Sequence, residues 1–239
     1  MAGLKRGYRI NETAIATFRL TGVVVFLWFV ASGHAVDWYQ YSPEQFAVQP
    51  ITQARIDPAD FDGQLMAAAI FHETNRVRLQ QGLPRFTHAA QLDVAATRKA
   101  TLGVLEIEVR HTSDFPFSAT PGERVKSAGL DYERVAENIA RIGSYDLPEG
   151  MTRLGVRQRN GRDEFYRLDT GRPPELQTYA GFATQVVASW MASPGHRANI
   201  LDPRLVSLGC AARPCRSLIS RHEQIYAVQV FFTPPSRQK

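Results

Sequence analysis

Five polar residues in otherwise apolar surroundings could carry chemistry: His111, Glu137, Asn138, His196 and Arg197. An imidazole can act near neutral pH as a general acid, a general base or a metal ligand, and a nearby carboxylate can orient it. Each residue also has a structural interpretation, such as capping a loop, bonding the backbone at a strand start or pairing with a carboxylate. For His196 that interpretation is a helix C-terminus, where the dipole favours a cation. The residues alone leave both kinds of interpretation open.

Several catalytic motifs are absent from the sequence. His72 and Glu73 begin like the HExxH motif of zinc proteases, but Arg76 stands where the second His belongs. The sequence contains no GxSxG elbow and no glycine-rich phosphate loop. No clear nucleophile therefore accompanies the His and Glu residues, which argues against covalent catalysis.

The composition is that of a globular protein. The chain has 239 residues, of which 44% are hydrophobic and 21% charged, the size of one large domain or one domain with extensions. Its formal net charge is +5, and residues 1–35 contribute +3, which leaves +2 for the rest. Such a small charge gives no reason to expect a nucleic-acid partner.

Residues 1–35 have the pattern of a secretory signal peptide. A basic segment precedes an apolar run, Leu20 to Ala31, and Gly33-His34-Ala35 offers small residues for cleavage after Ala35. The alternative is an uncleaved membrane anchor, although the run is shorter than the roughly 20 residues that a spanning helix needs. We expect a secreted or periplasmic protein.

The two cysteines, Cys210 and Cys215, enclose a short segment that contains Pro214. In an oxidising compartment this pattern predicts a local disulfide that ties a turn, and the alternative is two free thiols. A zinc site at these cysteines is not expected, because the sequence has no second Cys pair.

The hydrophobic periodicity predicts a mixed α/β domain. One helical pattern begins at Gly63 and ends at Gly82-Leu83-Pro84. Three more cover about 89–102, 123–128 and 179–190. Strand patterns cover 205–212 and 225–232, and the second is apolar enough for a central strand. Helices on both faces of a small sheet predict a three-layer α-β-α sandwich.

We divide the chain into the signal peptide 1–35, an N-terminal arm 36–62 and a domain 63–234 with an insertion at about 144–175. Aromatic residues of the arm, Tyr39 among them, are expected to pack on the domain. Asn160-Gly161 predicts a type I′ hairpin turn in the insertion. The arginines of the insertion are typical of a solvated face, and the alternative is a protein-binding surface.

Four motifs in order make the chain resemble the CAP superfamily, also called the SCP domain, in its exported bacterial form. They are Asn75-x-x-Arg78 followed by Gly82-Leu83-Pro84, then His111, then Ala136-Glu137-Asn138-Ile139-Ala140, and finally Trp190-x-x-Ser193-Pro194-x-His196-Arg197-x-Asn199-Ile200-Leu201. The resemblance covers about Leu65 to Phe232. It implies a small, mostly antiparallel central sheet and a cleft in which His111, Glu137 and His196 converge.

The resemblance also bears on metal binding. Eukaryotic members often carry two His and two Glu in the cleft, and in some members the two His bind a divalent metal. Ser193 stands where those members often have the second Glu, so the tetrad is incomplete in this chain.

Three functions remain open after the sequence, and one of them is a protein-interaction module that binds through the arginine-rich insertion at about 144–175. The other two concern the His and Glu residues. The first is a cleft that binds a lipid, a glycan fragment or a peptide of the cell envelope, with Asn138 and Arg197 beside the three central residues. The second is a metal-assisted hydrolase of wall polymer or protein, with zinc on His111 and His196 and with Glu137 as base. Whether the protein is an enzyme is therefore left open.

Overall fold

The computed structural model describes residues 36–106, 109–148, 150–151, 153–216 and 223–236. The signal-peptide and membrane-anchor interpretations concern residues 1–35, which lie outside the described residues. Within the described part of the chain, no helix is both long and apolar enough to cross a membrane.

A four-stranded sheet forms the centre of the domain. Its strands are β1 (Thr87–His88), β2 (Arg134–Gly143), β7 (Ser207–Arg216) and β8 (Glu223–Thr233), in the order β1-β7-β8-β2. β8 pairs antiparallel with β7 and β2, and only β1 runs parallel to its neighbour β7. All residues of β8 from 225 to 232 are buried, which confirms the predicted central strand.

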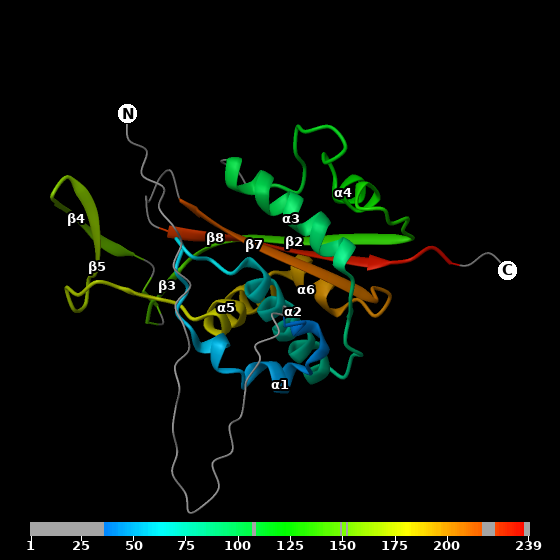
Figure 1. The fold of residues 1–239 in the computed structure, drawn as a ribbon, viewed down its shortest axis with the longest axis horizontal. Helices are drawn as coiled ribbons and strands as arrows, with labels where there is room; N and C mark the ends of the chain where they lie inside the picture. The colour runs from blue at the N-terminus through cyan, green and yellow to red at the C-terminus, as the bar shows by residue number, and fades with distance from the viewer. Residues whose placement is uncertain (1–35, 107–108, 149, 152, 217–222, 237–239) are drawn as a thin grey trace, which may run out of the picture. The chain divides into compact units, whose positions relative to one another are not determined.

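Helices cover both faces of this sheet (Figure 1). One face carries α1 (Pro43–Ala47), α2 (Gly63–Gln80), α5 (Tyr179–Ala192) and α6 (Pro194–Leu201), and the other carries α3 (Ala90–Leu105) and α4 (Pro121–Ser127). Each face has its own apolar core, with Trp190 and Phe231 in the first and Leu92 and Val230 in the second. The predicted three-layer α-β-α sandwich is confirmed.

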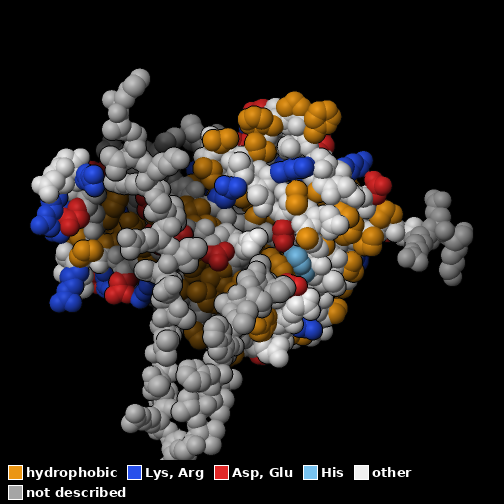
Figure 2. Space-filling view, viewed as in Figure 1, with side chains coloured by type: hydrophobic (Ala, Val, Ile, Leu, Met, Phe, Trp, Pro, Cys, Tyr) orange, Lys and Arg blue, Asp and Glu red, His pale blue; other side chains and the backbone are white. Residues whose placement is uncertain are grey.

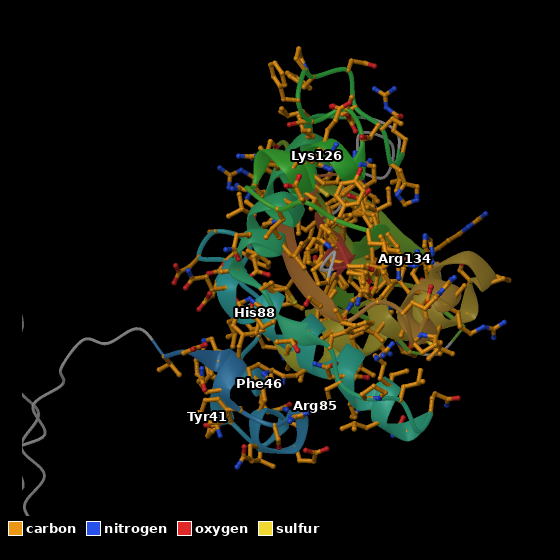
Figure 3. All side chains as sticks on the ribbon, turned by 90° about the vertical axis from the view of Figure 1, so that its right-hand side faces the viewer. Tyr41, Phe46, Arg85, His88, Lys126 and Arg134 are labelled. Carbon is orange, nitrogen blue, oxygen red and sulfur yellow. The ribbon has the colours of Figure 1, made fainter. Side chains whose placement is uncertain are left out.

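The N-terminal arm packs on the domain, as its aromatic residues predicted. It consists of the short helices η1 (Trp38–Gln40), α1 and η2 (Pro50–Gln53). Phe46 is buried and its ring stacks on His72, with the ring centroids 4.3 Å apart, and Tyr39 stacks on His88 at 3.4 Å. Figure 3 shows Tyr41 and Phe46 of the arm on the same flank of the domain as Arg85 and His88.

The segment 144–175 forms two small antiparallel ladders. β3 (Tyr145–Asp146) pairs with β6 (Glu175–Leu176), and β4 (Leu154–Arg159) pairs with β5 (Arg162–Arg167). Asn160 and Gly161 both have positive φ, 53° and 73°, as a type I′ turn requires. Figure 1 shows the β4–β5 hairpin standing away from the central sheet. The predicted hairpin is confirmed.

The charges of this segment balance one another. Six arginines and six acidic residues lie between 144 and 175. Arg157 donates to Glu164 at 2.7 Å, and Arg167 donates to Asp169 at 2.6 Å. The hairpin is visible at the left of Figure 2, where red and blue side chains alternate. These pairs support the solvated-face interpretation over a basic binding surface.

The predicted disulfide is wrong, because the segment of the two cysteines is a strand and not a turn. β7 continues through Cys210 and Cys215, and both are buried free thiols. Five strand residues span about 16 Å, and an odd separation sends the two side chains to opposite faces. Cys210 accordingly lies in the core under α2 and α5, and Cys215 in the core under α3. Pro214 is tolerated because β7 pairs on only one side beyond β1.

Candidate functional site

The site forms around β2, the edge strand of the central sheet. Alternation along this strand sends Glu137 to the face covered by α3 and α4 and Asn138 to the face covered by α6. Their partners on β8 follow the same alternation, since Glu137 pairs with the apolar Val230 and Asn138 with the polar Gln229. The two adjacent polar residues of the sequence therefore serve opposite faces.

Glu137 holds His111 in place and is itself held by Arg124. His111 Nδ1 lies 3.0 Å from Glu137 Oε1, and Arg124 Nη2 donates to Glu137 Oε2 at 2.7 Å. The side chains of Arg124 and Glu137 are 0% and 1% exposed. Since the carboxylate accepts, Nδ1 carries the hydrogen, and Nε2 is the ring nitrogen that Glu137 does not engage. The His111 side chain, 48% exposed, presents that nitrogen to the surface.

Arg124 also fixes the loop that carries His111. Its guanidinium donates to the backbone oxygens of His111 and Ser118 at 2.9 and 2.7 Å. Three acceptors therefore meet one buried cation, which compensates its charge and leaves the loop anchored. Loop and strand are joined through a single side chain.

A buried amide network supports the other face. Asn138 Nδ2 donates to Gln229 Oε1 at 3.0 Å and to the backbone oxygen of His196 at 3.1 Å. Asn199 Nδ2 donates to Asn138 Oδ1 at 2.8 Å, and Gln229 Nε2 donates to Thr74 Oγ1 at 2.6 Å. Because each polar group in this chain of contacts has a partner, the network fixes α6 against β2.

His196 lies at the start of a new helix, which corrects the helix-end interpretation. α5 ends at Ala192, and α6 begins directly at Pro194, with Ser193 between them. His196 is thus in the first turn of α6, where the dipole disfavours a protonated ring. Burial lowers the pKa of His196, and the nearby His111 ring lowers it further.

The structure brings the two imidazoles together across the edge of β2. The ring centroids of His111 and His196 are 6.4 Å apart, at an angle of 60°. His111 contacts Glu137, and Asn138 contacts the backbone of His196, so these four residues lie around the same edge of the sheet. Their role as a ligand site stays a prediction. Arg197 does not join them by any contact found among the described residues, and its side chain is exposed on the first turns of α6.

Sequence reasoning missed Arg124. It lies in a short helix beside Lys126, which is exposed, and no spacing distinguishes the two cations. Glu123, the residue before Arg124, is exposed. Its carboxylate accepts a hydrogen bond from the Ala119 backbone nitrogen at 3.0 Å, which stabilises the N-terminus of α4. It does not replace the missing second Glu.

The residues present do not fit a catalytic metal centre. Two imidazoles on one tetrahedral zinc would bring their centroids to about 5 Å, somewhat closer than observed. Catalytic zinc also keeps three protein ligands. Both Glu137 oxygens are already engaged, and the Arg124 cation beside it cancels the charge that would attract a divalent ion. Among the described residues, no group of three or more His, Cys, Asp or Glu is arranged to hold a metal.

A comparison with protein families identifies the class of protein to which this fold belongs. The model of the cysteine-rich secretory protein family, CAP, matches residues 71–231. The chain belongs to this family. Comparison with the curated proteins gives no match.

Solved structures show weaker likeness. An extracellular protein with an SCP domain from Bacillus anthracis is 19% identical with a TM-score of 0.47, over 71% of this chain and 41% of that one. An outer surface protein from Borrelia burgdorferi is 16% identical with a TM-score of 0.45, over 77% and 99%. This chain therefore spans less than half of the first of these proteins. With both TM-scores below 0.5, we draw no conclusion from these two likenesses.

Proposed function

We propose that the protein is exported and that the site of His111, Glu137 and His196 binds a ligand of the cell envelope without turning it over. The signal-like pattern of residues 1–35 supports export. The ligand would be a lipid, a glycan fragment or a peptide. Family membership alone does not decide between binding and catalysis, so the proposal rests on the geometry of the site.

One observation carries the proposal: Glu137 is fully committed to positioning. Both of its oxygens are engaged, at 2.7 and 3.0 Å, and its side chain is buried. A general base must reach the proton that it removes, and Glu137 could do so only by giving up Arg124 or His111. The two imidazoles remain as the groups that a ligand would meet. They offer hydrogen-bonding nitrogens on a site whose fixed charges cancel.

The presence of two neighbouring imidazoles is the observation that favours a second candidate, a metal-assisted hydrolase, although their rings, 6.4 Å apart, would have to move closer to share one zinc. Elemental analysis of protein purified without a His tag tests it. Stoichiometric zinc that disappears in His111→Ala/His196→Ala, together with hydrolysis of wall polymer or protein, would replace the binding proposal. Sub-stoichiometric metal and no gain of activity with added Zn²⁺ would reject the hydrolase.

Retention of envelope lipids, wall fragments and wall peptides on the immobilised protein tests the binding proposal. We expect one of these fractions to bind and the His111→Ala/His196→Ala variant to lose most of that binding. Arg162→Ala, at the tip of the β4–β5 hairpin, is the matched control and should bind normally. Equal retention by the double variant and the wild type would overturn the proposal.

A further inference from the structure

A hollow of about 300 Å³ lies between the inserted segment and α5, away from the paired imidazoles. β3 and the residues after β6 form one wall, and the exposed side of α5 forms the other. Figure 1 shows β3 beside α5. Its volume is at the lower end of the range of small-molecule sites.

The wall from the inserted segment is joined to the N-terminal arm. Arg55 of the N-terminal arm donates to the backbone oxygen of Leu176 at 2.6 Å and pairs with Asp146 and Glu175. These contacts join the arm to both strands of the β3–β6 ladder. A wall fixed before a ligand arrives lowers the entropy cost of binding.

An amide pair ties this wall to the helix. Gln177 Nε2 donates to the backbone oxygen of Gly143 at 3.0 Å and to Gln185 Oε1 at 2.6 Å. Gln177 is buried, whereas Gln185 is exposed on α5. Gln185 Oε1 accepts one hydrogen bond from Gln177, which leaves its second lone pair and the Nε2 hydrogens as the groups that Gln185 can offer to a ligand.

The lining has the chemistry of a polyol site. Its polar members are Tyr145, Asp146, Gln177, Thr178, Thr184 and Gln185, and the described residues that line it include no Lys, Arg or His. Hydroxyl and amide groups match a ligand that both donates and accepts hydrogen bonds. The Asp146 side chain, 62% exposed, accepts hydrogen bonds, and its pairing with Arg55 offsets part of its charge, so the hollow attracts neither anions nor cations strongly. Ala188 and Leu147 add apolar surface for a ring face.

We propose that this hollow binds a neutral saccharide, with Asp146 and Gln185 as its main hydrogen-bonding partners. The site is formed by the inserted segment together with α5. It is separate from the paired imidazoles and does not depend on the function proposed for them. A sugar ring would lie against Ala188 while its hydroxyls reach the two side chains from opposite walls.

Titration of the full chain with maltotriose and with the trimer of N-acetylglucosamine, followed by NMR of the sugar, tests the proposal. We expect binding of one or both, and the stronger one shows which neutral sugar is preferred. Gln185→Ala should weaken binding roughly threefold to tenfold, the worth of one hydrogen bond. Ala188→Phe fills the hollow and should abolish binding, whereas Ser189→Phe, exposed on the same helix but outside the hollow, should not.

Two results would overturn this proposal: neither trisaccharide binds, or Ala188→Phe and Ser189→Phe bind equally. A far-ultraviolet circular dichroism spectrum of each variant shows whether the fold is kept. The His111→Ala/His196→Ala variant separates the two proposals. Trisaccharide binding that survives this variant belongs to the hollow, and binding that it abolishes belongs to the imidazole site and would also reject the hollow.

Discussion

Replacing Arg124 by Met should destabilise the protein strongly, because it leaves Glu137 as a buried charge without its cation. Breaking a buried ion pair on one side costs about 3–5 kcal/mol. Two backbone oxygens, of His111 and Ser118, would lose their donor as well. For a domain of this size that loss lowers Tm by roughly 6–20 °C.

The double variant Arg124→Met/Glu137→Leu separates the buried charge from the packing. With both charges gone, it should recover the part of the loss that comes from the unpaired carboxylate, since an apolar pair of similar volume is often neutral or stabilising, but not the two backbone hydrogen bonds. Arg134→Met is the control, because Arg134 lies on β2 with Glu137 but at the surface. Arg134 is 41% exposed and pairs with Glu133 at 3.7 Å, so it should cost about 1 kcal/mol or less.

Urea unfolding followed by circular dichroism measures these free energies of unfolding. Arg124→Met should shift the midpoint far more than Arg134→Met, with an unchanged slope. A loss no larger than that of the control would refute the reasoning, because Glu137 would then not depend on its buried partner. A double variant less stable than Arg124→Met would refute it too.

Three other predictions follow from single contacts. The lowered pKa of His196 means that the unfolded chain takes up its proton first, so stability is full above about pH 6.5 and falls below it; urea midpoints from pH 5 to 8 should show this fall, and His196→Gln should reduce it. Gly103→Ala should cost about 1–3 kcal/mol in urea unfolding, because the added Cβ would overlap the Tyr226 ring; an unchanged midpoint would contradict the packing. Cys210 and Cys215, whose thiol pKa values are raised by burial, should react with a thiol reagent only after unfolding, and a reductant should leave Tm unchanged.

The parts of the fold with local signals could be predicted from the sequence. Gly82 ends α2 with a φ of 71°, and Asn160-Gly161 makes the hairpin turn, because few residues tolerate those conformations. These features depend on neighbours in sequence. The expectation that His111, Glu137 and His196 lie close together comes instead from the order of the four motifs, through the family resemblance.

Features set by distant parts of the chain could not be predicted. Pro214 favours a turn locally, but pairing with β8 keeps β7 extended through it. The sequence predicts a helix over 179–190 and none after it, although proline is common at the first position of a helix and α6 starts at Pro194. Arg124 is buried only because Glu137 and the His111 loop meet it across the fold, and nothing in its own segment indicates those partners.

The position of β8 in the middle of the sheet has a kinetic consequence. Its partners on β2 are distant in sequence, since Gly143 pairs with Gln224 and Arg134 with Thr233, 81 and 99 positions apart. Closing such long loops slows folding. β8 also comes after every other helix and strand found among the described residues. Neither core can therefore close until β8 is available, and a chain delivered from its N-terminus would stay open until β8 has been delivered.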